Sequence, residues 1–502
     1  MVTAMAKIGF DKEKYLRIQS QHIKERIEQF NGKLYMEFGG KLADDYHASR
    51  VLPGFEPDSK LKMLSQLADD AEIIIVISAE DIEKNKVRSD YGITYDEDVL
   101  RLRDEFMDRG FKADSVVITH FNGQDSARMY RQRLEREGIK VFYHYIIDGY
   151  PNDIVKINSD EGFGKNDYIE TTRPLVVVTA PGPGSGKMAT CLSQLYHEHK
   201  RGVKAGYAKF ETFPIWDLPL NHPVHLAYEA ATADLDDVNM IDPFHLEAYG
   251  RMAVNYNRDI EIFPVLNSIF EGIFGESPYK SPTDMGVNMI GSCICDDDIC
   301  REAAKQEIIR RYYRSLNDFA KGKCEESEVN KQSLLMRKAG ITTADRAVTV
   351  AAKNKKQESG ESSAAIELLD GTILTARSIP LLGASASLLL NATKYLAGID
   401  HHINLIPAKM IEPIQKTKVN ILGGHNPRLH TDEVLIALSM LSVYDDNCSK
   451  AIEQLPALRG CQVHTTEMLS ETDKNVFRKL GIELTSEPIK KRKKLRSEEN
   501  KQ

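Results

Sequence analysis

The chain has 502 residues, and its 66 lysines and arginines against 74 aspartates and glutamates give a formal net charge of −8. At roughly 100–200 residues per domain, this length predicts two to four domains and excludes a single small module. Hydrophobic residues make up 42% and charged residues 28% of the chain, a balance typical of folded soluble proteins. The acidic balance disfavours general nucleic-acid binding because no overall positive field faces the phosphate backbone.

Membrane and export signals are missing from the sequence. No apolar run approaches the ~18 residues of a membrane span, and the N-terminal segment lacks the continuous apolar stretch of a secretory signal. Seven cysteines, an odd number, fit reduced thiols better than a disulfide framework. Three of them form a C-x-C-x₄-C pattern that lacks the second pair of a zinc site. We therefore expect a cytoplasmic protein with no membrane partner and no structural zinc.

The first third of the chain alternates between strand-like and helix-like runs, which predicts a layered α/β fold with parallel strands. Two of the helices end at a glycine, a common helix C-terminal signal. We expect a Rossmann-like part up to about residue 160, with strands at 33–38, 72–78, 115–120 and 139–147 and helices at 95–109 and 126–137.

A complete strand–helix–strand unit follows, with strands at 174–179 and 203–210 and a helix at 188–201. We expect this unit to form a separate P-loop-like part of an N-terminal α/β region spanning residues 1–298. Residues 299–352 are charged and helical, which indicates a helical connector.

The polar segment 353–363 has no apolar periodicity and predicts a linker or an exposed loop. A smaller C-terminal α/β domain is expected at 364–488, with a hairpin across Asp370-Gly371 and a helix at 384–396. The basic residues 489–502, which include the run KKRKK, predict a disordered, solubilising tail, although such a run can also be a nuclear address.

The most informative motif lies at Leu175–Leu195, LVVVTAPGPGSGKMATCLSQL. A buried strand leads into Gly182, Gly184, Ser185 and Gly186, and then into Lys187 and an amphipathic helix. Glycines allow backbone N–H groups to turn toward an anion, the helix N-terminus adds a partial positive charge, and the lysine adds a mobile cation. The segment resembles a Walker A phosphate-binding loop.

Two positions depart from that motif. Pro181 stands where the first glycine is expected, and Met188 replaces the hydroxyl residue that usually binds Mg²⁺. Thr179, Ser185 or Thr190 are possible substitutes for that hydroxyl. The alternative is an ordinary Gly/Pro turn before a helix, with Lys187 facing solvent.

The next strand strengthens the phosphate interpretation. The order strand, G-K loop, helix and AGY-x-K strand resembles dethiobiotin synthetase and its P-loop relatives, which are ATP-dependent enzymes acting on small carboxylates. By that resemblance, Lys209 faces the phosphates or an anionic substrate, and Glu211 and Asp217 hold a metal ion. The alternative for Lys209 is a strand-edge lysine in water.

Further candidate residues lie in two loops. His47 and Arg50 follow a strand-ending Gly pair and would suit an anionic substrate. Near the far end, Arg428 and His430 precede an apolar helix for which Thr431 is the expected N-cap. Two acidic groups complete the candidates. Glu80 and Asp81 follow the second strand, and their alternative is a helix N-cap. The second group could hold Mg²⁺, and its alternative is a solvated helix end and loop: Glu229, Asp234, Asp236, Asp237 and Asp242.

Several long blocks resemble a mainly bacterial family of cytosolic proteins, uncharacterised protein family three-seven-one, also known as domain of unknown function eighteen-forty-six. The resemblance covers about Ile8 to Pro488 and implies a larger N-terminal α/β part, a helical segment and a smaller C-terminal α/β part. It implies no reaction or catalytic residues. The blocks are 37–55, 181–202, 239–250, 281–289 and 426–434.

The sequence thus favours a nucleotide-dependent enzyme, ligase-like or kinase-like, that acts on a small anionic metabolite. ATP or another nucleotide with Mg²⁺ would be its cofactor, and His47, Arg50, Lys209, Arg428 and His430 its catalytic or substrate-binding groups. The alternative is a nucleotide- or metabolite-binding regulator without turnover, which the methionine at position 188 favours. A homo-oligomer is compatible with either function.

Overall fold

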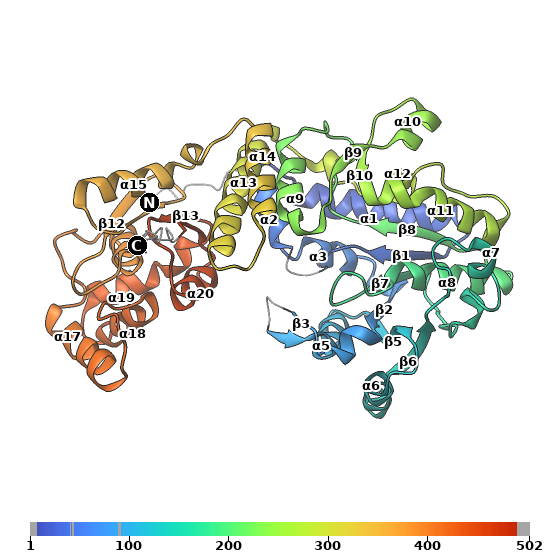
Figure 1. Ribbon diagram of the computed structural model, residues 1–502, viewed down its shortest axis with the longest axis horizontal. Coiled ribbons are helices and arrows are strands. Elements are labelled where there is room, and N and C mark those ends of the chain that lie inside the picture. Colours follow the sequence, from blue (N-terminus) through green and yellow to red (C-terminus); the bar gives the residue numbers. More distant parts are fainter. Residues whose placement is uncertain (1–7, 41, 43–44, 89–91, 489–502) are drawn as a thin grey trace, which may run out of the picture. The chain divides into compact units, whose positions relative to one another are not determined.

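The computed structural model describes residues 8–40, 42, 45–88 and 92–488 (Figure 1). The chain divides into two compact units, one of residues 7–304 and one that begins at Lys305. Lys41 and the predicted tail at 489–502 lie outside the described residues. None of the helices that the structure describes combines the length and apolarity needed to span a bilayer. All seven cysteines are free thiols, as the sequence predicted.

The N-terminal unit is built on a six-stranded sheet in the order β6-β5-β2-β7-β1-β8. Every neighbouring pair is parallel, so all six carboxyl ends lie along one edge. The strands are β1 (Leu34–Phe38), β2 (Ala71–Ser78), β5 (Lys112–Phe121), β6 (Lys140–Tyr145), β7 (Leu175–Thr179) and β8 (Gly206–Phe210). These strands confirm the predicted ones, with ends that differ by at most three residues.

The strand order corrects the expected division of this unit near residue 160. β7 lies between β2 and β1, with Leu175 opposite Ala71 on one side and Leu34 on the other. Strands from before and after residue 160 therefore interleave in one sheet instead of forming two parts. Strand order depends on pairing between distant segments, which local periodicity does not encode.

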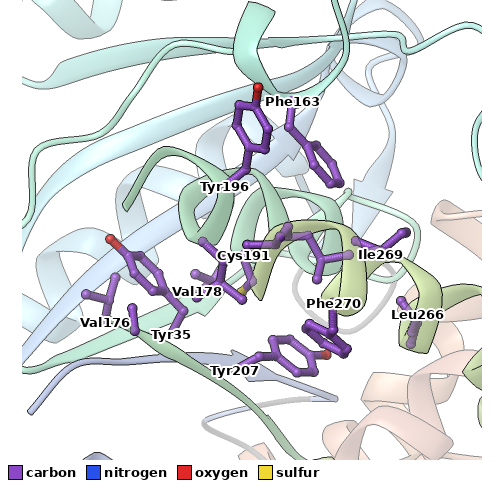
Figure 2. Close-up of a cluster of buried hydrophobic side chains, with 14 of the residues drawn as sticks. Tyr35, Phe163, Val176, Val178, Cys191, Tyr196, Tyr207, Leu266, Ile269 and Phe270 are labelled. Carbon is purple, nitrogen blue, oxygen red and sulfur yellow. The ribbon is translucent and has the colours of Figure 1, made fainter. Parts of the chain in front are cut away.

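Helices α8 (Lys187–Lys200) and α11 (Asn257–Phe274) pack on one face of this sheet. Because strand side chains alternate, Tyr35, Val176 and Tyr207 all point to that face. Figure 2 shows them meeting Cys191 of α8 and Phe270 of α11 in the main apolar cluster. This packing fixes where α8 begins, and hence where the glycine loop lies.

The other helices of this unit follow local signals. Thr94 and Glu97 form a capping box at the start of α5, and Asp45 accepts a hydrogen bond from the backbone N–H of Ala48 at the start of α2. The predicted helices 95–109, 126–137 and 188–201 are confirmed as α5, α6 and α8. The helices are α1 (Lys12–Gln29), α2 (Tyr46–Val51), α3 (Ser59–Ser65), α4 (Ala79–Glu83), α5 (Tyr95–Asp108), α6 (Asp125–Arg136), α7 (Ile154–Ile157), α9 (Pro223–Ala231), α10 (Pro243–Tyr249) and α12 (Pro282–Met285); the short strands are β3 (Val87–Arg88), β4 (Ile93–Thr94), β9 (Asn239–Ile241) and β10 (Val254–Tyr256).

The C-terminal unit contains a four-stranded sheet in the order β12-β11-β13-β14. The predicted hairpin is confirmed, because β11 and β12 pair antiparallel across the turn at Asp370-Gly371. The predicted helix 384–396 is α16, with the same bounds. The elements are β11 (Ser363–Glu367), β12 (Ile373–Arg377), β13 (Gln462–Thr465), β14 (Glu483–Ser486), α14 (Glu326–Lys338), α15 (Ala347–Ser359), α16 (Ala384–Leu396), α17 (Ala408–Lys416), α18 (Thr431–Leu441), α19 (Asp446–Glu453) and α20 (Glu471–Lys479); α13 (Asp297–Ala320) runs across the division between the units.

The linker or exposed loop predicted at 353–363 is wrong for most of its length. Helix α15 continues to Ser359 and ends at Gly360, which has φ +69°. Lysine, glutamine and glutamate are good helix formers, and a glycine with positive φ is a frequent helix C-cap. The polar composition of this segment therefore marks an exposed helix and not a flexible connection.

Candidate functional site

The glycine loop, here residues 180–187, lies where the connections of two neighbouring strands diverge. The chain passes from β2 to β5, toward the β6 edge of the sheet. From β7 it passes through α8 to β8, which forms the opposite edge. In open α/β sheets, ligands bind outside the carboxyl ends of the strands at such a topological switch point. The loop therefore occupies the position in this fold where a ligand site is expected.

The backbone of the glycine loop has the conformation that its glycines permit. Gly184 has φ +73° and Gly186 has φ +83°, which side chains with a Cβ disfavour. Within the described part of the chain, the backbone N–H groups from Gly184 to Ala189 donate to no protein acceptor. A helix start alone would leave only its first turn without acceptors, so the loop extends this run of free donors by two residues.

Internal contacts hold the loop in place. The Ser185 hydroxyl donates to the carbonyl of Gly182 (2.6 Å), and the Thr119 hydroxyl at the end of β5 donates to the carbonyl of Ser185 (2.6 Å). A Cβ on Gly182 would overlap the ring of Tyr95, so this glycine permits close packing. The loop is thus anchored through carbonyls and side chains, which leaves its N–H groups available.

The side chains at the start of α8 differ in their surroundings. Lys187 is half-buried, and its ammonium forms no ion pair or hydrogen bond with any residue that the structure describes. Met188 packs against the main apolar cluster. The buried Thr190 hydroxyl donates to the carbonyl of Gly186 (3.0 Å). Lys187 is therefore the one of these three that is available to a ligand.

A buried charge cluster lies at the carboxyl ends of β1 and β8. The Lys209 ammonium lies 2.6 and 2.7 Å from the two carboxylate oxygens of Asp259, in the first turn of α11, and 3.1 Å from Glu211. Glu37 of β1 pairs in register with Lys209 and accepts a hydrogen bond from the Tyr207 hydroxyl (2.7 Å). Lys209 thus lies in a largely buried ion-pair network and not at an exposed strand edge.

The cluster holds three carboxylates and one ammonium, and this excess of negative charge perturbs its titration. Burial raises the pKa of Glu211 to about 7, with the nearby Asp259 adding to the rise and Lys209 opposing it. Burial would lower the pKa of Lys209, but its carboxylate partners outweigh burial and raise it. A carboxyl group that titrates near neutrality is suited to proton transfer.

His47 and Arg50 lie on the short helix α2, three residues apart and hence on similar sides of it. The His47 ring packs edge-on to Phe213 (5.2 Å between ring centroids) and lies 5.8 Å from Tyr228. Tyr228 is also close enough to Glu211 for that carboxylate to raise its pKa, after the larger effect of burial. An aromatic bridge therefore connects His47 to the charge cluster. Burial lowers the pKa of Arg50.

Asp217 and Glu211, the two expected metal ligands, contact different segments, since Glu211 lies against Gly39. Asp217 is exposed and lies against Gly291. Its carboxylate adds to the rise in the pKa of Cys293, which is caused mainly by burial. Among the described residues, the only group of at least three His, Cys, Asp or Glu ligand atoms close enough to hold a metal is the exposed turn Asp400-His401-His402.

The other acidic candidates have structural partners. Glu80 pairs with Lys84 (2.9 Å) and Asp81 with Lys86 (3.0 Å), and Ser78 caps α4. In the second acidic group, Glu229 accepts from the backbone of Asn239, Asp242 caps α10, and Asp237 pairs with Arg258 (2.6 Å). Glu80 and Asp81 thus lie in the first turn of α4 behind its N-cap, Ser78. The solvated-loop alternative is wrong for Glu229, Asp237 and Asp242, which are buried.

Arg428 and His430 belong to the C-terminal unit. Arg428 lies 3.7 Å from Glu361. His430 stands immediately before α18, so it occupies the N-cap position predicted for Thr431, and its Nδ1 lies 2.9 Å from Asp473. The backbone N–H and hydroxyl of Thr431 both donate to Asp473 (2.9 Å each). These groups form a side-chain network that joins α18 to α20.

Sequence reasoning missed Glu37, Asp259 and Tyr228, which complete the charge cluster and its aromatic bridge. Glu37 carried a usable signal, because it is a lone carboxylate in the buried strand LYMEF. A charge in such a strand requires a partner. Asp259 had no such signal, since an acidic residue in the first turn of a helix is ordinary.

The chain is similar to a set of bacterial proteins along almost its whole length. The N-terminal domain of unknown function DUF1846 matches residues 8–340, and its C-terminal counterpart matches residues 344–495. A UPF0371 protein of Corynebacterium urealyticum is 57% identical over 484 residues, or 96% of this chain and 97% of the relative. A UPF0371 protein of Streptococcus pyogenes serotype M5 is 56% identical over 491 residues, or 98% of this chain and 99% of the relative. The chain therefore belongs to the DUF1846 (UPF0371) family, the family that its sequence blocks resemble.

Proposed function

We propose that this protein is a nucleotide-dependent enzyme that holds the phosphates of ATP or another nucleotide at the glycine loop and acts on a small anionic metabolite. The observation that carries the proposal is the run of backbone N–H groups without acceptors from Gly184 to Ala189, beside Lys187 and at the topological switch point. Phosphate oxygens are the ligands that best satisfy such a cluster of donors.

The charge cluster supports turnover in addition to binding. Glu211 has a pKa near neutrality, which suits a general acid or base. Lys209 can exchange one of its carboxylate partners for an anionic substrate, and His47 and Arg50 lie on the neighbouring helix. We expect Mg²⁺ to enter with the nucleotide, held mainly by its phosphates. The free thiols fit a cytoplasmic setting for this reaction.

The second candidate is a nucleotide-binding regulator without turnover. Met188 favours it, because this side chain packs in the apolar cluster and leaves no hydroxyl for Mg²⁺ at that position. Turnover separates the two functions, whereas binding does not.

Calorimetric titration of ATP and GTP tests the binding step. We expect the variant Lys187→Ala to lose at least tenfold in affinity, which is about 1.4 kcal/mol. Lys204→Ala, which removes an exposed lysine beyond the far end of α8, should bind as the wild type does. Equal affinity in all three proteins would remove Lys187 from the proposal.

Turnover is then assayed with the wild type and a mixture of small carboxylates and phosphates, by following nucleotide hydrolysis products. Metabolite-dependent product release supports the enzyme, and binding without release supports the regulator. If no nucleotide binds, both functions fail.

A further inference from the structure

His120, near the carboxyl end of β5, has an unusual backbone conformation. Its φ is +50°, in the left-handed region. Few residues other than glycine adopt a positive φ, and only four such residues occur in the part of the chain that the structure describes. Residues held in this region cluster at functional sites, where the surrounding structure fixes them. The conformation of His120 therefore calls for an account of its surroundings.

The sheet is irregular at the same position. Between Ile118 and Phe121, β5 advances by three residues, whereas its partner β6 advances by two, from Tyr143 to Tyr145. The extra residue of β5 lies between them, at position 119 or 120. Bulges of this kind redirect side chains and are frequent next to active sites.

Two successive side chains of β5 reach the same side of this bulge. In a regular strand, successive side chains point to opposite faces. Here the Thr119 hydroxyl donates to the carbonyl of Ser185 in the glycine loop (2.6 Å). The next side chain, His120, lies with its Nδ1 3.3 Å from the hydroxyl oxygen of Ser78, at the end of β2. Because β2 lies between β5 and β7, from which the glycine loop leaves, the His120 ring is directed toward that loop.

The hydrogen bond with Ser78 assigns the hydrogen of the His120 ring. The Ser78 side chain is buried, and its oxygen accepts the backbone N–H of Glu80 at the start of α4 (3.2 Å). Among the described residues, the only acceptor for the hydroxyl hydrogen is Nδ1 of His120. An imidazole that accepts at Nδ1 carries a hydrogen on Nε2. No described residue forms a hydrogen bond with Nε2, so this half-buried ring has a donor available beside the glycine loop.

We propose that His120 is a phosphate-contacting residue, whose Nε2–H donates to a phosphate oxygen of the nucleotide at the glycine loop. This inference rests on the proposed function and extends it by a contact from β5, in addition to the loop and Lys187. A ring donor beside the backbone N–H groups adds to the donors around the phosphates. Such a donor stabilises the charge on phosphate oxygens during phosphoryl transfer. With a hydrogen on Nε2, that nitrogen has no lone pair with which to accept a phosphoryl group itself.

Calorimetric titration of ATP with Mg²⁺ tests this contact. The variant His120→Asn removes Nε2, while asparagine tolerates a positive φ and keeps a short polar side chain near Ser78. We expect its affinity for ATP to fall at least about tenfold, as for the loss of a hydrogen bond to a charged group. His22→Asn is the matched control and should bind as the wild type does, because His22 is also half-buried but lies on α1, 3.6 Å from Glu25.

The titrations separate this inference from the proposed function. If ATP binds the wild type and His120→Asn with equal affinity, this inference is overturned and the proposed function remains. If no nucleotide binds the wild type, both are overturned. Circular dichroism checks that the two variants fold as the wild type does.

Chemical modification of the wild type provides a second test that needs no variant. Diethyl pyrocarbonate modifies accessible imidazole nitrogens, and peptide mass spectrometry measures each histidine separately. Saturating ATP should slow the modification of His120 several-fold and leave that of His22 unchanged. The inference is overturned if His120 does not react without ATP, or reacts equally with and without it. An acid-labile phosphate on His120 after incubation with ATP would also overturn it, because that bond requires a lone pair on the ring nitrogen.

Discussion

The Lys209 ammonium lies within 2.7 Å of both carboxylate oxygens of Asp259, which ties the edge strand β8 to the first turn of α11. The two side chains are only 13% and 14% exposed, so water screens the pair weakly. A carboxylate in a first helical turn is also favoured by the helix dipole. The pair therefore stabilises the N-terminal unit and at the same time holds Lys209 beside Glu211.

Asp259→Asn should destabilise the N-terminal unit by about 2–4 kcal/mol, because the buried Lys209 ammonium loses its shortest ion pair, which it makes with both carboxylate oxygens. Urea unfolding followed by the fluorescence of Trp216, the single tryptophan and a residue of this unit, measures the change. Glu80→Gln removes an exposed pair with Lys84 and should leave the unfolding midpoint unchanged. Equal midpoints for the wild type and Asp259→Asn would contradict the role assigned to the pair.

Gly184→Ala should weaken nucleotide binding at least tenfold, because alanine disfavours φ +73° and would redirect the N–H groups of the loop. Gly202→Ala is a close control: Gly202 has the same φ of +73°, and a Cβ at either position meets no atom within 4 Å. Both variants should lose about 1 kcal/mol of stability, but only Gly184→Ala should change the calorimetric affinity. A parallel loss of affinity in Gly202→Ala would point to general destabilisation.

Thr119→Val should loosen the glycine loop from β5 by removing the hydroxyl that donates to the carbonyl of Ser185. We expect a loss of about 1 kcal/mol in stability, as for one buried hydrogen bond, and a several-fold weaker nucleotide affinity. Thr393→Val removes a buried hydroxyl of α16, which donates to the carbonyl of Leu389, and should change stability without changing affinity. Unchanged nucleotide affinity in Thr119→Val would mean that this hydrogen bond does not position the loop.

Acid should destabilise the N-terminal unit through His225, whose pKa burial lowers to about 4. Its ring is buried between the backbone N–H of Ile215, which donates to Nε2, and the carbonyl of Pro219. Between pH 6.5 and 4 the unfolded chain binds a proton there and the folded chain does not, so the free energy of unfolding falls as pH falls. One such group contributes a slope of about 1.4 kcal/mol per pH unit.

His225→Asn should remove the contribution of this one proton, so the slope of the free energy of unfolding against pH should fall by about 1.4 kcal/mol per pH unit. A pH-independent loss of stability from the altered hydrogen bonds should accompany this change. Urea unfolding at pH 7, 6 and 5, again read from Trp216, gives the slope. The same slope in both proteins would show that His225 is not held neutral by the fold.

The sequence by itself determined the local elements and the position of the glycine loop. Strand alternation, capping residues and glycine stops act between residues a few positions apart, so their patterns identify β7, α8 and α16 to within a residue of their bounds. The segment 353–363 was the exception, because a polar exposed helix and a linker share a composition.

Only the tertiary structure decided the order of the strands and the partners of the charged residues. β7 enters the sheet between β2 and β1, and Lys209 pairs with an aspartate 50 residues further along the chain. Both depend on contacts between distant segments, which leave no periodic trace in either segment. For the same reason, the structure and not the motif showed that the glycine loop lies at a switch point and that Lys209 is enclosed by carboxylates.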